Sequence, residues 1–232
     1  MKDKIIIPFD VQTRDEFDYL LKELSGTATF AKVGMELFYR FGPNIIEDLK
    51  QHNFKIFLDL KLHDIPNTVH HACKVLGEME VDILNVHSSG GREMMQAARE
   101  GFKLSHKKGL IIGVTQLTST TQKVMNSEFN ISGSVEDSVL SLANMTKESG
   151  LDGVVCSAQE VQTIKAALGK DFKCITPGIR PLNYQKDDQK RIMTPTEAIQ
   201  AGSDYLVIGR PITKADSPKE AYLKILKDIS HE

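Results

Sequence analysis

Short hydrophobic runs alternate along the chain with longer segments that have the period of an amphipathic helix. Eight runs rich in β-branched and aliphatic residues predict strands. They are KIIIPFD (4–10), ATFAKVG (28–34), FKIFLDL (54–60), DILNVH (82–87), GLIIGVT (109–115), DGVVCS (152–157), FKCIT (172–176) and YLVIGR (205–210). Helical patterns between or after them include residues 13–25, 90–105, 136–149 and 218–229.

This alternation predicts an α/β fold. Strands that are apolar on both faces and alternate with helices indicate a parallel sheet covered on both sides. Eight such units in 232 residues favour a single-domain (β/α)8 TIM barrel over residues 1–232. The alternative is an open doubly wound sheet, which requires a Gly-rich turn after the first strand, and PFDVQTRD (8–15) supplies none.

Composition narrows the class of protein further. The 29 Lys and Arg residues nearly balance 31 Asp and Glu, without long runs of one sign, which argues against nucleic-acid or membrane-surface binding. Cys73, Cys156 and Cys174 lack C-x-x-C spacing and are expected to be buried thiols. The N-terminal apolar stretch is short, and no segment approaches the ~20 apolar residues of a membrane span. We therefore expect a soluble, cytoplasmic protein.

Charged residues follow the first three predicted strands. Active sites of such barrels lie at the carboxyl ends of the strands. The first strand closes with Asp10, the second with Lys32, and the third with Asp59 and Lys61. Because side chains alternate along a strand, Asp59 and Lys61 share one face. The four charges are expected to converge, and at an effective dielectric near 20 a pair ~4 Å apart interacts by ~4 kcal/mol.

An isolated charge at a strand end is best explained as a salt bridge, but four charges at one rim favour a function. A lysine held among carboxylates stays protonated at neutral pH, so it is suited to giving a proton to a carbanion. A nearby fixed carboxylate would repel a substrate carboxylate, and decarboxylation would relieve that repulsion.

The last two predicted strands lead into an anion site. Gly178 and Arg180 follow the seventh strand, and Gly209 and Arg210 follow the eighth. In (β/α)8 barrels the loops after strands seven and eight commonly hold phosphate, with glycine allowing close backbone approach and arginine supplying charge. The pattern predicts a phosphorylated substrate.

Taken together, these motifs resemble one known family over nearly the whole chain. The matching segments are FD (9–10), AKVGMELF (31–38), DLKLHDIPNT (59–68), VTQLTS (114–119), TPGIRP (176–181), DDQKRIMTP (187–195) and VIGRPI (207–212). In that order they resemble orotidine 5'-phosphate decarboxylase. The resemblance implies decarboxylation of orotidine 5'-monophosphate to uridine 5'-monophosphate in pyrimidine synthesis, without a cofactor.

The resemblance also implies roles for individual residues. Lys61 would protonate C6 as carbon dioxide leaves, Asp59 would lie beside the substrate carboxylate, and Lys32 would complete the charged array. Asp64 and Thr68 would reach the site of the neighbouring subunit, so a homodimer with shared active sites is expected.

Further residues would bind the substrate itself. Asp10 would bind the ribose hydroxyls together with Lys32, and Thr118 would contact the pyrimidine. The phosphate region would be held by Arg180, Gln189, Gly209 and Arg210.

Histidines near the predicted site raise the question of a metal. His63, His70, His71 and His87 could in principle join an aspartate as ligands. His70 and His71 are adjacent on a predicted helix and point about 100° apart. No H-x-H or H-E-x-x-H spacing occurs, so we predict no catalytic metal.

Two other functions remain open at this point. A related decarboxylase or epimerase acting on sugar phosphates could use the same D-x-K-x-x-D pattern with magnesium. A protein that binds nucleotides without turning them over is the other alternative, although plain binding would not need the charged array.

Overall fold

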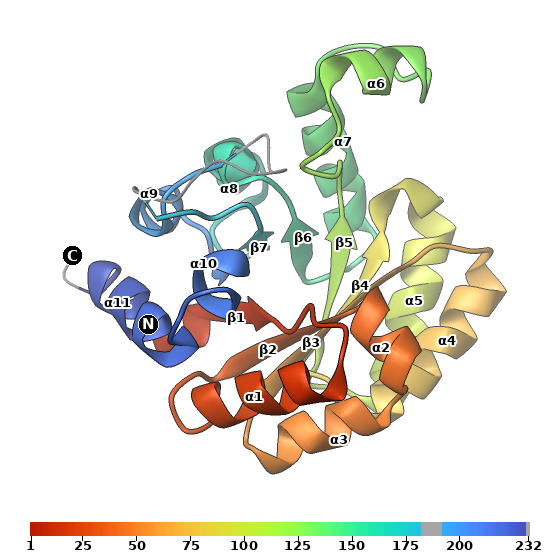
Figure 1. The fold of residues 1–232 in the computed structure, drawn as a ribbon. Coiled ribbons are helices and arrows are strands. Elements are labelled where there is room, and N and C mark those ends of the chain that lie inside the picture. Colours follow the sequence, from red (N-terminus) through yellow and green to blue (C-terminus); the bar gives the residue numbers. More distant parts are fainter. Residues whose placement is uncertain (182–191, 231–232) are drawn as a thin grey trace.

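The strands form a closed parallel barrel. The structure is a computed structural model that describes residues 1–181 and 192–230. Over these residues the strand order runs from β1 to β8 and back to β1 (Figure 1). The strands are β1 (Ile5–Pro8), β2 (Phe30–Gly34), β3 (Lys55–Leu62), β4 (Ile83–His87), β5 (Leu110–Val114), β6 (Gly153–Val155), β7 (Lys173–Thr176) and β8 (Tyr205–Val207). The predicted (β/α)8 barrel is confirmed.

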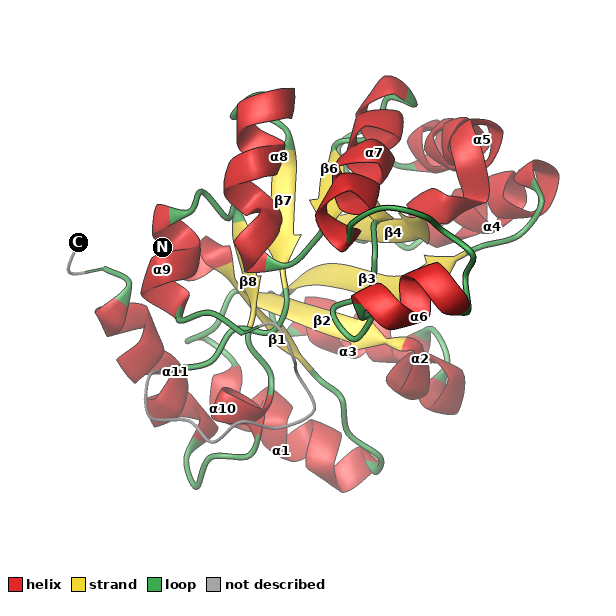
Figure 2. Cartoon of the chain, turned by 90° about the horizontal axis from the view of Figure 1, so that it is seen from above, coloured by secondary structure: helices red, strands yellow, loops and turns green. Residues whose placement is uncertain are grey.

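Helices surround the barrel on all sides when it is viewed from above (Figure 2). The α-helices are α1 (Arg14–Leu24), α2 (Met35–Phe41), α3 (Asn44–Gln51), α4 (Pro66–Glu78), α5 (Gly91–Ser105), α6 (Gln122–Ser127), α7 (Val135–Glu148), α8 (Val161–Leu168), α9 (Pro195–Gln200), α10 (Arg210–Thr213) and α11 (Pro218–Asp228). Short 3-10 turns are η1 (Lys2–Lys4), η2 (Ser88–Gly90) and η3 (Ala158–Glu160).

Local sequence signals explain where several helices begin. Thr13 caps α1: its side chain accepts a hydrogen bond from the backbone N–H of Glu16, and the Glu16 carboxylate accepts one from the backbone N–H of Thr13. Thr194 caps α9 in the same way. Proline occupies the first position of α4, α9 and α11, where its missing N–H is not needed.

The barrel interior is apolar in its middle and polar above it. Inward side chains from seven strands form one buried cluster: Ile6, Phe30, Phe57, Ile83, Ile112, Ile175 and Val207. Two residues further along β2, β3 and β4, the same face carries Lys32, Asp59 and Asn85. Ile5 and Ile7 belong instead to the core between barrel and helices. The period-2 alternation therefore places the polar residues on an apolar floor at the carboxyl ends of the strands.

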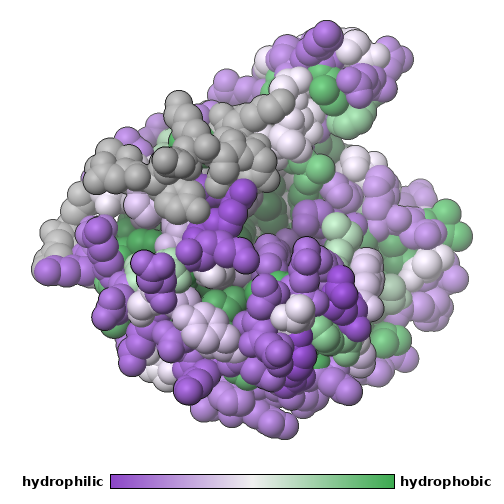
Figure 3. Space-filling model, in the orientation of Figure 1, coloured by the Kyte–Doolittle hydropathy of each residue, from purple (hydrophilic) through white to green (hydrophobic). Residues whose placement is uncertain are grey.

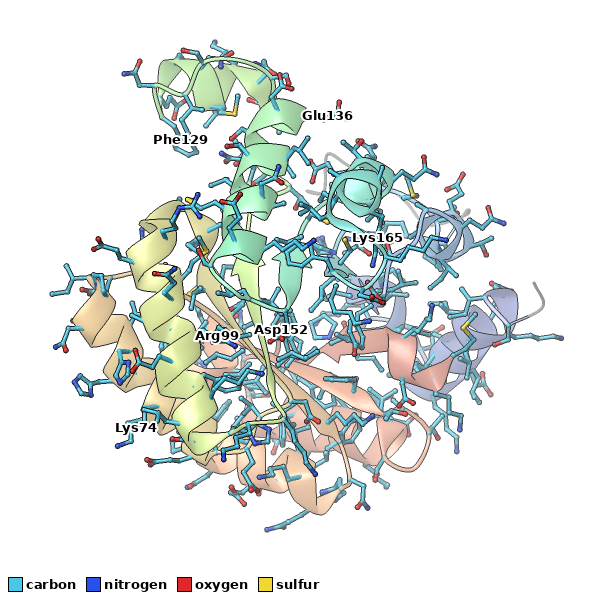
Figure 4. All side chains as sticks on the ribbon, turned by 180° about the vertical axis from the view of Figure 1, so that it is seen from behind. Lys74, Arg99, Phe129, Glu136, Asp152 and Lys165 are labelled. Carbon is cyan, nitrogen blue, oxygen red and sulfur yellow. The ribbon has the colours of Figure 1, made fainter. Side chains whose placement is uncertain are left out.

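Aspartates tie neighbouring strands together at the opposite end of the barrel. Asp82, Asp152 and Asp204 each stand immediately before an even-numbered strand. Each carboxylate accepts a hydrogen bond of 2.8 to 2.9 Å from a backbone N–H of the preceding strand. Asp204 also pairs with Lys165 of α8, which is labelled with Asp152 in Figure 4. These bonds stabilise the fold at the end away from the charged residues.

The surface is mostly hydrophilic in the view of Figure 3, with hydrophobic residues scattered over it. The largest departure from the barrel outline is α6, which projects above the end of β5 (Figure 1). Phe129, just after α6, is 53% exposed (Figure 4). Among the described residues, no helix combines the length and hydropathy that crossing a membrane requires.

Candidate active site

Four charged side chains meet at the carboxyl ends of β1, β2 and β3. The ammonium group of Lys32 lies 3.1 Å from Asp10 Oδ1 and 3.3 Å from Asp59 Oδ2. Lys61 Nζ lies 2.6 Å from Asp59 Oδ1. Positive and negative groups therefore alternate from Asp10 through Lys32 and Asp59 to Lys61, and we call these four residues the charged array. The convergence expected from the strand pattern is present.

Burial and pairing compete in setting the charge states of this array. Burial opposes the charge of Lys32, but attraction by Asp59 and Asp10 outweighs it and raises the pKa of Lys32 above its ordinary value. Burial also acts to raise the pKa of Asp59. Lys32, Lys61 and a hydrogen bond from Asn85 outweigh it, so the pKa of Asp59 is lowered. Lys32 and Asp59 are thus held as ions at neutral pH.

A glycine at the end of β2 leaves space for the array. A Cβ atom at Gly34 would lie 3.1 Å from both Asp10 Oδ1 and Lys32 Nζ. A side chain there would crowd the ion pair between these two residues. Steric crowding therefore explains why glycine occupies position 34.

Sequence reasoning missed Asn85, although it contacts two members of the array. Its side chain on β4 is fully buried, and its Nδ2 donates a 2.6 Å hydrogen bond to Asp59 Oδ1. Its Oδ1 accepts a 2.8 Å bond from the backbone N–H of Lys61. The available signal was one amide inside the otherwise apolar run ILNV (83–86), since buried polar groups need partners.

One cavity of about 440 Å³ extends from the array towards the ends of β7 and β8. Its lining includes Asp10, Gly178, Arg180, Gly209 and Arg210. Gly178 has a φ of +76°, a backbone conformation that glycine adopts readily. Arg180, Gly209 and Arg210, which were predicted to hold the phosphate, thus line one cavity with Asp10, Lys32 and Asp59 of the charged array. Lys214, which sequence reasoning did not single out, also lines it.

A second cavity of about 390 Å³ extends from the array towards the end of β5. Thr118 lines it together with apolar groups that include Phe57, Val114 and Val155. Both cavities are lined by Lys32 and Asp59, as well as by Pro177 and Val207. A bound molecule could therefore extend through both, with an apolar-walled half on one side and a cationic half on the other.

Two predicted site residues among the described ones, Asp64 and Thr68, do not line these cavities. Asp64 is exposed between β3 and α4, and its Oδ1 accepts a 2.6 Å hydrogen bond from the backbone N–H of Ile65. Thr68 is exposed in the first turn of α4. Gln189 lies outside the described residues. Asp64 and Thr68 are thus available on the outer surface of this chain near the site.

The sequence suggests the histidines as possible metal ligands and the cysteines as buried thiols. The rings of His63 and His87 lie 5.6 Å apart, and burial together with the nearby charges of His63 and Lys61 lowers the pKa of His87. No group of three potential metal ligands from His, Cys, Asp and Glu occurs among residues 1–181 and 192–230. The absence of a catalytic metal stays a prediction. The three cysteines are buried and none forms a disulfide, as expected.

Comparison with known proteins identifies the family. The model of the family described as "Orotidine 5'-phosphate decarboxylase / HUMPS family" matches residues 3–225. The chain belongs to this family. A relative named orotidine 5'-phosphate decarboxylase, from Streptococcus suis (strain 05ZYH33), is 50% identical over 224 residues, which cover 96% of each chain. Another of that name, from Streptococcus pneumoniae serotype 19F (strain G54), is 57% identical over 193 residues, covering 83% of this chain and 82% of the relative.

Solved structures agree with membership of the orotidine 5'-phosphate decarboxylase / HUMPS family. The crystal structure of orotidine 5'-phosphate decarboxylase from Lactobacillus acidophilus superimposes with a TM-score of 0.87 at 40% identity, covering 97% of this chain and 98% of that one. The family resemblance seen in the sequence motifs is therefore confirmed, and the chain is an enzyme of the decarboxylase type by family.

Proposed function

We propose that this protein decarboxylates orotidine 5'-monophosphate to uridine 5'-monophosphate without a cofactor, as a step of pyrimidine synthesis. The observation that carries the proposal is the contact between Lys61 and Asp59. Asp59 lines both the cavity that presents Arg180 and Arg210 and the second cavity, which Lys61 also lines. Relatives named for this activity, at 50% and 57% identity, support it.

The charged array suits the bond changes of this reaction. The bond between C6 of the pyrimidine and the carboxylate breaks, carbon dioxide leaves, and the electron pair stays on C6. Asp59, held as an ion beside the substrate carboxylate, repels it and favours its departure. Lys61 Nζ then gives a proton to C6 and later regains one from solvent. Lys32 neutralises the inner side of Asp59.

The two cavities accommodate the two ends of the substrate. The phosphate would lie beside Gly209 and the two arginines, Arg180 and Arg210, whose guanidinium groups can pair with its oxygens. The pyrimidine would lie between the apolar walls of the second cavity, near Thr118. Asp10 and Lys32 would bind the ribose hydroxyls between them. Gln189 would add to the phosphate contacts.

We further propose that two copies of this chain share their active sites. Asp64 and Thr68 are exposed and line neither cavity of their own chain, which agrees with a role in the site of a partner subunit. Residues 1–232 would act as one catalytic domain in the cytoplasm.

A spectroscopic assay tests the proposed function directly. Purified protein is incubated with orotidine 5'-monophosphate and EDTA while the ultraviolet absorbance of the substrate is followed. We expect loss of the substrate and formation of uridine 5'-monophosphate at an undiminished rate in EDTA. A protein that only binds nucleotides gives no turnover, and an enzyme of the magnesium-dependent sugar-phosphate type is inhibited by the chelator. Either result contradicts the proposal.

A further inference from the structure

The hydrogen-bond ladder between β3 and β4 is irregular beside the charged array. Leu58 pairs with Leu84, and the next pair joins Leu62 to Val86. Three residues of β3 (59–61) therefore lie opposite one residue of β4, Asn85. Such a bulge bends the strand locally and changes the direction of its side chains.

The backbone at Lys61 adopts a conformation that needs support. Its φ is +52°, in the left-handed region that residues other than glycine seldom occupy. Holding a residue there is unfavourable, and such residues persist where their surroundings fix them. The residue concerned is the one proposed to donate the proton.

Asn85 supplies the contact that the bulge removes from the ladder. Its Oδ1 accepts the backbone N–H of Lys61 at 2.8 Å, and its Nδ2 donates to Asp59 Oδ1 at 2.6 Å. These partners fix the orientation of the amide, because the reversed orientation would oppose donor to donor at Lys61 and acceptor to acceptor at Asp59. The Asn85 side chain therefore links the backbone of Lys61 to the Asp59 carboxylate, which the ammonium group of Lys61 also contacts.

The surroundings of Asn85 make this link hard to replace. The side chain is fully buried, and its amide oxygen is the acceptor for the Lys61 N–H. The residue in register on β5 is Ile112, which has no side-chain hydrogen-bonding group. Leaving the Lys61 N–H without an acceptor is unfavourable, which favours movement of the bulge when the amide is removed.

We propose that Asn85 is a positioning residue, which holds the Lys61 bulge so that the ammonium group and the Asp59 carboxylate keep the geometry needed for proton transfer. The inference rests on the proposed function. Because Asn85 lines neither cavity, its removal should change the chemical step rather than nucleotide binding. Misplacing a reacting group by about 1 Å can cost ~10²-fold in rate.

Kinetics of two variants test this inference. Asn85→Ala removes both bonds, and Asn85→Leu does the same while filling the space. We expect each to lower kcat by ~10²-fold and to leave KM and the affinity for uridine 5'-monophosphate nearly unchanged. Thr146→Val is the matched control. It removes a buried hydroxyl that lies 2.8 Å from Ser88 Oγ, away from the array, and should leave kcat unchanged.

Crystal structures of the variants provide a readout that does not depend on turnover. We expect Lys61 to leave its φ of +52° and its Nζ to move away from the 2.6 Å contact with Asp59. The inference would be overturned if a folded Asn85 variant kept wild-type kcat or kept the wild-type geometry of Lys61. An equal loss of kcat in Thr146→Val would overturn it too. If the wild-type protein does not consume the substrate, the proposed function fails, while the structures still decide whether Asn85 positions Lys61.

Discussion

Asp59 has the most partners of any residue in the charged array. Its Oδ1 accepts bonds from Lys61 and Asn85, and its Oδ2 faces Lys32 at 3.3 Å. A buried carboxylate with such neighbours is stable as an ion, and removing it would leave two ammonium groups close together. At the residue scale, Asp59 therefore determines how the stability of the site depends on pH.

Replacing Asp59 should change the acid limb of the stability curve. The pKa of Asp59 is lower in the folded state than in the unfolded chain, where aspartate titrates near ~3.9. Its contribution to stability is therefore present above that value and lost as the pH falls through the folded-state pKa. Urea unfolding of wild type and Asp59→Asn across the acid range should show a difference that changes with pH there.

The exposed Asp171 provides the control for this measurement. Asp171→Asn removes an exposed charge and should change the free energy of unfolding only slightly. A difference between wild type and Asp59→Asn that stays constant through the whole acid range would show that the Asp59 charge is not linked to folding.

Single residues could be predicted from the sequence where the strand period alone places them. Asp10, Lys32, Asp59 and Lys61 follow apolar strands, so alternation and the barrel topology suffice to bring them together. Asn85 was missed because its role depends on partners 24 and 26 residues away in the chain, and an amide carries no charge to draw attention.

Elements were easier to predict than their irregularities. The eight strand runs and the four named helical segments overlap observed elements, because hydrophobic period depends on local sequence. The bulge in β3 could not be predicted, since it is defined by the register with β4. The positive φ of Lys61 likewise has no local signature such as a glycine.

The elements that follow β7 and β8 provide a test of phosphate binding. Arg210 begins α10 and lines the cavity on the side of the predicted phosphate. Arg210→Ala should lower kcat/KM for orotidine 5'-monophosphate by roughly 10- to 100-fold, from loss of about 1.5–3 kcal/mol of charged hydrogen bonding. The rate with the unphosphorylated nucleoside, orotidine, should be almost unaffected. Equal losses on both substrates would indicate damage to the fold instead.

The aspartates at the opposite end of the barrel should affect stability alone. Asp152 accepts a bond from the backbone of Ile111 and lies 3.5 Å from Lys103. Asp152→Ala should lower the free energy of unfolding by about 1–3 kcal/mol and leave kcat unchanged. Denaturant unfolding and steady-state kinetics measure the two effects, with Asp171→Ala as control. A loss of kcat in the folded variant would show that this end of the barrel influences the site.

At the scale of the whole molecule, the outer position of Asp64 leads to a prediction about assembly. If each site takes Lys61 from one chain and Asp64 from the other, Lys61→Ala and Asp64→Ala should each inactivate a homodimer. A mixed dimer of the two variants holds one site with both defects and one site with neither. Random exchange makes about half of the dimers mixed, so activity should recover to roughly a quarter of wild type.

Subunit exchange needs to be verified in this experiment, for example with differently tagged chains. Once exchange is verified, a mixture that stays inactive shows that Asp64 serves the site of its own chain. The pattern of strands and helices does not predict which exposed residues contact a partner subunit, so a role for Asp64 in the partner's site could not be derived from it.

The central claim is that Lys61 gives its proton to C6 of the substrate, and one comparison tests it most directly. Turnover of orotidine 5'-monophosphate by wild type and Lys61→Ala is measured together with the affinity of each for uridine 5'-monophosphate. Positioned proton transfer typically contributes ~10²–10⁴-fold, so Lys61→Ala should lose at least that much turnover while losing far less product affinity. A folded Lys61→Ala protein with turnover near that of wild type would contradict the account.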